Sequence, residues 1–206
     1  MALLSALLDR IHDEFPSVPE ALALRALSDA VKEFCVRTHI WQADLRVSLR
    51  EGTTTYTLYP DTGMQIVALK DVRLDGTKIH PVATDGVRLR RDTPAAAAPS
   101  SFIQLTPDTI EMVAAPVDAA RLNVKAAVTL ALGETSIEIP DSLADEYGED
   151  LAMGAKMRLV RQAGQPWYAP ETTGYSVAFY RAITAAKGRA MSGLGEAEMQ
   201  IQMRSW

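Results

Sequence analysis

The sequence predicts an α+β fold: helices from the N- and C-terminal parts of the chain pack together, a central antiparallel β-sandwich or barrel-like unit lies between them in sequence, and an extended C-terminal tail follows. Apolar residues near both ends recur at helical spacing, whereas the middle of the chain alternates apolar and polar residues between turn signals. The final residues offer too little apolar surface to form a core, because burying them would not offset the entropy lost on ordering.

These patterns divide the 206 residues into four parts. Residues 1–42 supply N-terminal helices, and residues 140–191 supply a C-terminal helical hairpin that belongs to the same helical domain. Residues 43–139 form a central β domain, for which we expect roughly six to eight strands. Residues 192–206 form an extended anchor tail.

The N-terminal part is predicted to begin with a short amphipathic helix over residues 1–8. This stretch lacks the basic start of a signal peptide, and no apolar run approaches the roughly 20 residues that cross a bilayer, so we expect a soluble chain without a membrane partner. Ser17-Val18-Pro19-Glu20 is typical of a capping box that begins a long helix. The buried face of that helix is predicted to comprise Leu24, Leu27, Ala30, Val31, Phe34, Cys35 and Thr38, with Trp41 at its end.

The central part carries strand and turn signals. Alternating apolar and polar residues predict strands over 45–49, 55–59, 64–74, 101–105, 109–113 and 121–130. Glu51-Gly52 indicates a turn, and Asp75-Gly76 is the strongest hairpin signal in the chain, with a return strand through residues 78–81. Residues 88–100 have no periodic apolar face and are predicted to form an exposed loop, whose Arg88, Arg90 and Arg91 are expected to be solvated.

Two helices are predicted in the C-terminal part. Ile139-Pro140-Asp141-Ser142 ends a strand and is expected to cap the first helix with side-chain oxygens. Apolar residues then recur at every fourth position, namely Leu143, Tyr147, Leu151, Ala155 and Leu159. Gly164-Gln165-Pro166-Trp167 ends this helix, and Pro170 and Glu171 are expected to begin the second. The apolar stripe of the second helix comprises Tyr175, Ala178, Phe179, Ala182, Ile183 and Ala186.

The tail is predicted to bind the surface of a partner. Ser192-Gly193-Leu194-Gly195 breaks the preceding helix. Met199, Ile201 and Met203 then alternate with polar residues, so an extended conformation would place their side chains on one edge, with Trp206 at the end. A frayed terminus is the alternative reading of the same residues.

Composition and motifs exclude several kinds of function. A net charge of −5 and a pI near 5.3 argue against a protein that grips nucleic acid through its phosphates. Cys35 is the single cysteine and is expected to be a buried thiol, and His12, His39 and His80 are scattered rather than set at metal-ligand spacing. No phosphate-binding loop or nucleophile elbow is present. The sequence therefore predicts no catalytic, cofactor or metal-binding residue, and no enzyme.

The carboxylates of residues 141–150 are better explained by the helix dipole and by solvation than by catalysis. One alternative is a small enzyme. Its site would be assembled on the β unit from His80, Asp85 or the Arg90 loop. An accessory domain that binds a protein partner through the same tail is the other alternative.

The order of these segments resembles the adaptor (head–tail connector) proteins of tailed bacteriophages over nearly the whole chain. Ala26–Cys35 followed by Trp41 is similar to the first long helix of that family. The remaining similar stretches are Tyr56-Thr57-Leu58, Val72–Gly76, Ile139–Leu143 with Tyr147 and Gly154-Ala155, and Gln165-Pro166-Trp167 before a helix that ends near Ala190.

The resemblance implies a structural virion protein, made in the host cytoplasm and located at the head–tail interface. It implies a ring of about twelve copies that joins the portal protein to the next tail component, a nozzle, tail tube or stopper, and lets the genome pass through its lumen without sequence-specific binding. The residues expected to bind the portal are Leu194, Met199, Ile201, Met203 and Trp206. Those expected in ring packing or in the core are Leu143, Tyr147, Leu151, Trp167, Tyr175 and Phe179.

Overall fold

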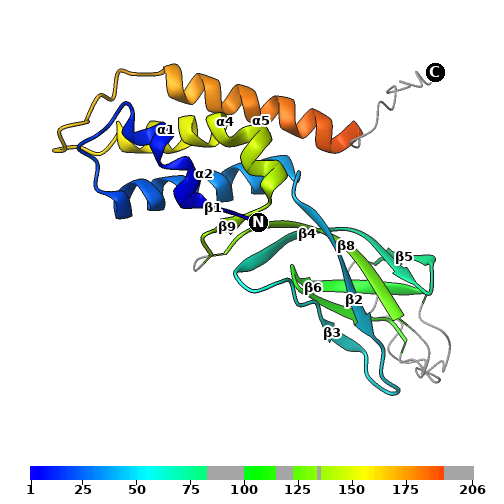
Figure 1. The fold of residues 1–206 in the computed structure, drawn as a ribbon. Coiled ribbons are helices and arrows are strands. Elements are labelled where there is room, and N and C mark those ends of the chain that lie inside the picture. The colour runs from blue at the N-terminus through cyan, green and yellow to red at the C-terminus, as the bar shows by residue number, and fades with distance from the viewer. Residues whose placement is uncertain (83–99, 115–122, 134–135, 193–206) are drawn as a thin grey trace, which may run out of the picture. The chain divides into compact units, whose positions relative to one another are not determined.

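The computed structural model describes residues 1–82, 100–114, 123–133 and 136–192 (Figure 1). The chain divides into a helical unit, residues 1–41 and 131–206, and a β unit, residues 42–130. Helices and a curled sheet occur together, which confirms the predicted α+β class. Among the described residues, no helix combines the length and the apolar character needed to cross a membrane.

The prediction of a helix over residues 1–8 is wrong at its start, where the helical unit begins with a short strand. Strand β1 (Ala2–Leu3) pairs antiparallel with β9 (Glu138–Ile139), and the Leu4 amide donates to the Ile137 carbonyl at 2.8 Å. A 3-10 turn, η1 (Leu4–Leu7), and a single helical turn, α1 (Asp9–His12), follow. The partner strand supplies the backbone hydrogen bonds that a helix would have made internally.

Three long helices make up the rest of the helical unit: α2 (Glu20–Thr38), α4 (Asp141–Leu159) and α5 (Gly174–Ser192). The predicted side-chain caps of α2 and α4 are wrong, because neither helix has a side-chain cap hydrogen bond. Pro19 and Pro140 occupy the cap positions instead, and each prolyl carbonyl accepts the first amide bonds of its helix at 2.9–3.1 Å. The carbonyl of any N-cap residue accepts these amides, so proline adds no side-chain acceptor and both helices begin without a side-chain cap.

Helix α5 begins at Gly174 rather than at Pro170 and Glu171. The Ala169 amide donates to the Val160 carbonyl at 2.9 Å, and the Thr172 amide donates to the Ala169 carbonyl at 3.0 Å. These bonds hold the residues before Gly174 in turns, so the helix starts later than the proline suggested.

Helices α2, α4 and α5 meet where Gly154 faces Phe179 and Ala30. A Cβ atom on Gly154 would lie 2.6 Å from one ring carbon of Phe179 and 2.9 Å from the Ala30 Cβ. The Phe34 ring adds contacts with both other helices, since its centroid is 5.1 Å from that of Tyr147 and 6.2 Å from that of Phe179. Only a residue without a side chain allows this approach.

An ion pair between a buried lysine and an exposed glutamate connects the N-terminal segment to α4 and α5. The Lys156 ammonium lies 2.8 Å from the Glu14 carboxylate, and the lysine side chain is only 8 % exposed. The Tyr175 hydroxyl donates a hydrogen bond to the same carboxylate. Burial and the Glu14 carboxylate raise the pKa of Tyr175 to about 12. Burial acts to raise the pKa of Glu14, but the hydrogen bonds from Lys156 and Tyr175 and the lysine charge outweigh it and lower that pKa.

The β unit contains one seven-stranded sheet in the order β2-β8-β4-β5-β6-β7-β3. Its strands are β2 (Gln42–Ser48), β3 (Thr55–Thr57), β4 (Met64–Leu74), β5 (Thr77–Pro81), β6 (Ser101–Thr106), β7 (Thr109–Met112) and β8 (Asn123–Leu132), the last of which crosses into the helical unit. The predicted hairpin is confirmed, with positive φ angles at Asp75 and Gly76 of 47° and 84°. One pair, β5 with β6, is parallel, whereas the sequence predicted an antiparallel unit. The predicted loop over residues 88–100 lies outside the described residues, apart from its last one.

We predict that Gly154→Ala lowers the free energy of unfolding by about 1–3 kcal/mol, because the added methyl group collides with a packed ring and a packed Cβ. Urea denaturation measures this change. Gly188→Ala is the matched control: it adds the same methyl group to α5, where no atom lies within 4 Å of the new Cβ. The control should gain up to about 1 kcal/mol from helix propensity. Equal stability of Gly154→Ala and the wild type would contradict the packing described.

We predict that Glu14→Gln lowers the free energy of unfolding by about 1–2 kcal/mol, because the buried Lys156 ammonium loses its anionic partner. The loss is no larger because Glu14 is half-exposed, and water screens its charge. The lowered pKa of Glu14 means that its contribution is present above its ordinary pKa and is lost as the pH falls through the folded-state value. The wild type and the variant should therefore converge on acidification.

Chemical denaturation of both proteins across acidic pH tests this dependence. Adding Lys156→Met to Glu14→Gln should recover the lost stability, because it removes the unpaired ammonium and leaves an apolar side chain of similar length. A constant difference between the wild type and Glu14→Gln down to the acid transition would rule out the ion pair as the cause.

Candidate interaction surface

The residues predicted for ring packing or the core gather in the helical unit. Five of them, Leu143, Tyr147, Leu151, Trp167 and Phe179, are buried within one copy of the chain. Tyr175 is half-buried and bonds to Glu14. The residues predicted for portal binding, Leu194, Met199, Ile201, Met203 and Trp206, lie outside the described residues, and their role stays a prediction.

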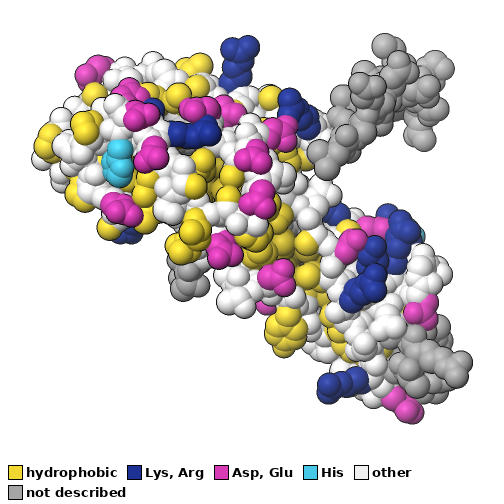
Figure 2. Space-filling view, viewed as in Figure 1, with side chains coloured by type: hydrophobic (Ala, Val, Ile, Leu, Met, Phe, Trp, Pro, Cys, Tyr) yellow, Lys and Arg dark blue, Asp and Glu magenta, His cyan; other side chains and the backbone are white. Residues whose placement is uncertain are grey.

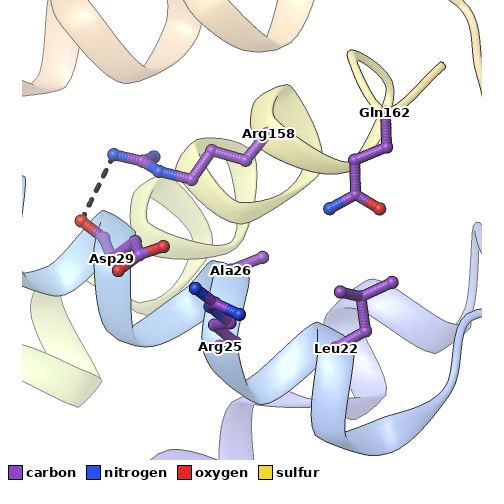
Figure 3. Close-up of a pocket in the computed structure, with 6 residues that line it drawn as sticks. All are labelled: Leu22, Arg25, Ala26, Asp29, Arg158 and Gln162. Atoms are coloured by element: carbon purple, nitrogen blue, oxygen red, sulfur yellow. Dashed lines mark hydrogen bonds between the residues drawn. The ribbon is translucent and has the colours of Figure 1, made fainter.

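A cleft of about 330 Å³ opens between α2 and the C-terminal end of α4 (Figure 3). Its lining is Leu22, Arg25, Ala26, Asp29, Arg158 and Gln162. The Arg158 guanidinium donates to the Gly154 carbonyl at 2.7 Å and to the Asp29 carbonyl at 3.2 Å, and it pairs with the Glu33 carboxylate. These bonds connect α2 and α4, so the role of Arg158 is structural. The cleft lining offers no histidine, cysteine or hydroxyl nucleophile.

The titratable groups do not form a reaction centre in the described part of the chain. No group of three or more His, Cys, Asp or Glu side chains there could hold a metal ion. Burial raises the pKa of Cys35 to about 12, which keeps that thiol protonated and unreactive. His80 is exposed, and the Asp85 and Arg90 positions weighed for an enzyme site lie outside the described residues. In the β unit, hydrogen bonds from Arg73 and Lys78 lower the pKa of half-buried Asp71, as expected of a carboxylate paired with two cations.

Helix α5 has a second apolar stripe, on a side other than its buried one. Successive helical residues lie 100° apart, so five exposed positions fall within an arc of about 80°. We call this the α5 outer face: Val177, Tyr180, Thr184, Gly188 and Met191. Val177 and Met191 are 65 % and 73 % exposed. In Figure 1, α5 runs along one edge of the helical unit.

The first half of α4 carries a cluster of carboxylates that we call the α4 acidic face: Asp145, Glu146, Glu149 and Asp150. The first three are exposed and Asp150 is half-buried. Figure 2 shows Asp and Glu side chains, in magenta, spread over the side of the helical unit in view. Glu146 pairs with Arg189 of α5, and Glu149 pairs with Arg10 at 2.6 Å. Burial and the Glu149 charge raise the pKa of Asp150.

The α5 outer face was not predicted from the sequence. Its signal was present, since Val177, Tyr180, Thr184 and Met191 follow helical spacing. The stripe through Phe179, Ile183 and Ala186 is the stronger one, and the structure confirms that these three residues are buried. Recognising a second stripe requires knowing which side of the helix the rest of the chain covers.

Comparison with known proteins identifies the family. The description of the SU10 adaptor protein family matches residues 2–203, nearly the whole chain, which confirms the resemblance to phage head–tail adaptors. No curated protein matches the chain closely enough to count as a relative. Adaptors of this kind are structural components of the virion rather than enzymes. The chain belongs to the SU10 adaptor protein family.

Proposed function

We propose that this protein forms the adaptor ring that joins the portal to the tail of a tailed bacteriophage and continues the DNA channel. The observation that carries the proposal is the family match over residues 2–203. The exposed apolar residues of α5 support it, because a helix that is apolar on two sides gains stability when a partner covers the outer side. A ring of about twelve copies would supply such partners.

Anchoring would use the C-terminal tail. Its alternating Met199, Ile201 and Met203 and its terminal Trp206 suit an extended segment that adds to a groove of the portal protein. Ordering such a segment costs entropy that binding has to offset, so the tail binds weakly as a single copy. Repetition around the ring then converts a modest contact into a stable joint through effective concentration. The chain is therefore expected to be a monomer until the portal templates its assembly.

The charge of the chain fits a channel through which DNA moves. Strong retention of DNA needs clustered Lys and Arg that neutralise phosphates, whereas this chain has 26 acidic and 21 basic residues. A ring with this excess of acidic over basic residues would let the DNA move through the channel without binding it strongly. The lower partner is the next tail component, contacted through the β unit.

We predict that full-length protein mixed with the portal protein of the same genome adds about twelve copies per portal, measured as mass by light scattering. A chain that ends at Met191 should fail to bind, because it lacks the anchor. A full-length chain with Met199, Ile201, Met203 and Trp206 changed to Ser is the matched control for tail length, and it should fail too. No association by the full-length protein would contradict the proposed function. Binding by all three forms would remove the anchoring role from the tail while leaving the ring intact.

A further inference from the structure

The α5 outer face contains a glycine that the chain's own packing does not require. A Cβ atom on Gly188 would meet no atom within 4 Å. Glycine inside a helix costs about 1 kcal/mol relative to alanine, so a single copy would be more stable with a side chain there. Gly188 lies between Thr184 and Met191 on the exposed stripe, where the missing side chain would let another helix approach closely.

The charges beside this face determine what kind of partner it accepts. Arg181 and Lys187 flank the stripe on its two sides, and α5 contains Arg189 as well but no carboxylate. Neither Arg181 nor Lys187 forms an ion pair with any residue that the structure describes. Packing α5 of one copy on α5 of another would bring like charges together, which is unfavourable. The partner surface is therefore expected to be a different, acidic one.

The chain itself carries such a surface. On the α4 acidic face, Asp145 and Asp150 have no cation partner among the described residues, in contrast to Glu146 and Glu149. The Arg189–Glu146 pair within one copy shows that α5 cations and α4 carboxylates are of suitable length to pair. Two unpaired cations beside the α5 outer face thus match two unpaired carboxylates on α4.

We propose that the α5 outer face of one copy packs against the α4 acidic face of a second copy, with Arg181 and Lys187 pairing with Asp145 and Asp150. The contact joins two different surfaces, which is the arrangement that closes copies into a ring. Val177, Tyr180 and Met191 supply the apolar centre and Gly188 the close approach, while the charges at the rim fix the orientation. This inference rests on the proposed ring and names the surfaces that build it.

Charge reversal on each face tests the contact in the full-length chain assembled on the portal protein, with occupancy measured by light scattering. Arg181→Glu with Lys187→Glu should raise the chain concentration for half-maximal occupancy by about tenfold or more, and Asp145→Lys with Asp150→Lys should do the same. A chain that carries all four changes should recover occupancy, because each interface again pairs opposite charges. Arg161→Glu with Lys70→Glu controls for net charge, since these exposed residues belong neither to α5 nor to the α4 acidic face, and it should assemble as the wild type does.

Gly188→Leu is a second, uncharged test. It should leave the free energy of unfolding of the single chain unchanged or higher, because the new side chain has open space, yet it should lower ring occupancy. Unchanged stability with unchanged occupancy would overturn the close approach at this position and, with it, the contact.

The outcomes separate this inference from the proposed function. Normal portal occupancy by both reversed pairs would overturn the α5–α4 contact and leave the adaptor role standing. Loss with the α5 pair but no recovery in the four-change chain would also overturn it and assign the α5 outer face to the portal protein. If the wild type does not bind the portal, the adaptor role fails, and the contact, which rests on the ring, fails with it.

Discussion

The close approach of three helices at Gly154 is the constraint on which the helical unit depends. Because Gly154 has no side chain, the Phe179 ring of α5 and Ala30 of α2 can both lie against α4. Arg158 seals the same crossing, since its guanidinium binds the Gly154 carbonyl and lies 5.7 Å from the centre of the Phe179 ring. This anchoring fixes which side of α5 is buried, and so it also fixes which side faces outward with Val177 and Met191 exposed.

Local patterns were enough to predict the elements whose structure depends on neighbouring residues. The apolar spacing predicted α2 and α4, and Asp75-Gly76 predicted its hairpin because both residues tolerate positive φ. Contacts between distant segments were not predictable in this way. Strand β1 forms because β9 offers it a partner, and the parallel β5–β6 pair depends on a connection whose course the sequence does not specify. The cap predictions failed for a different reason: Pro19 and Pro140 occupy the cap positions, so Ser17 lies before the start of α2 and Asp141 is already the first residue of α4.

The candidate surfaces show the same division. The anchor tail was proposed from composition alone, and its residues lie outside those that the structure describes. The ion pair of Lys156 could not be predicted from the sequence, because its partner Glu14 lies far away along the chain. The α5 outer face could be separated from the buried stripe only once the fold was known. Only the structure shows that, among the described residues, no atom lies within 4 Å of a Cβ built on Gly188. Because the chain belongs to an adaptor family, a neighbouring copy is the partner that we consider for the α5 outer face.

Imaging of the portal–adaptor particle by electron cryomicroscopy tests the central claim most directly. The account predicts a closed ring of about twelve helical units beneath the portal, surrounding an open channel and continuous with it. Each unit should place α5 beside α4 of the next. Portal particles that carry no added ring after incubation with the full-length chain would contradict the account.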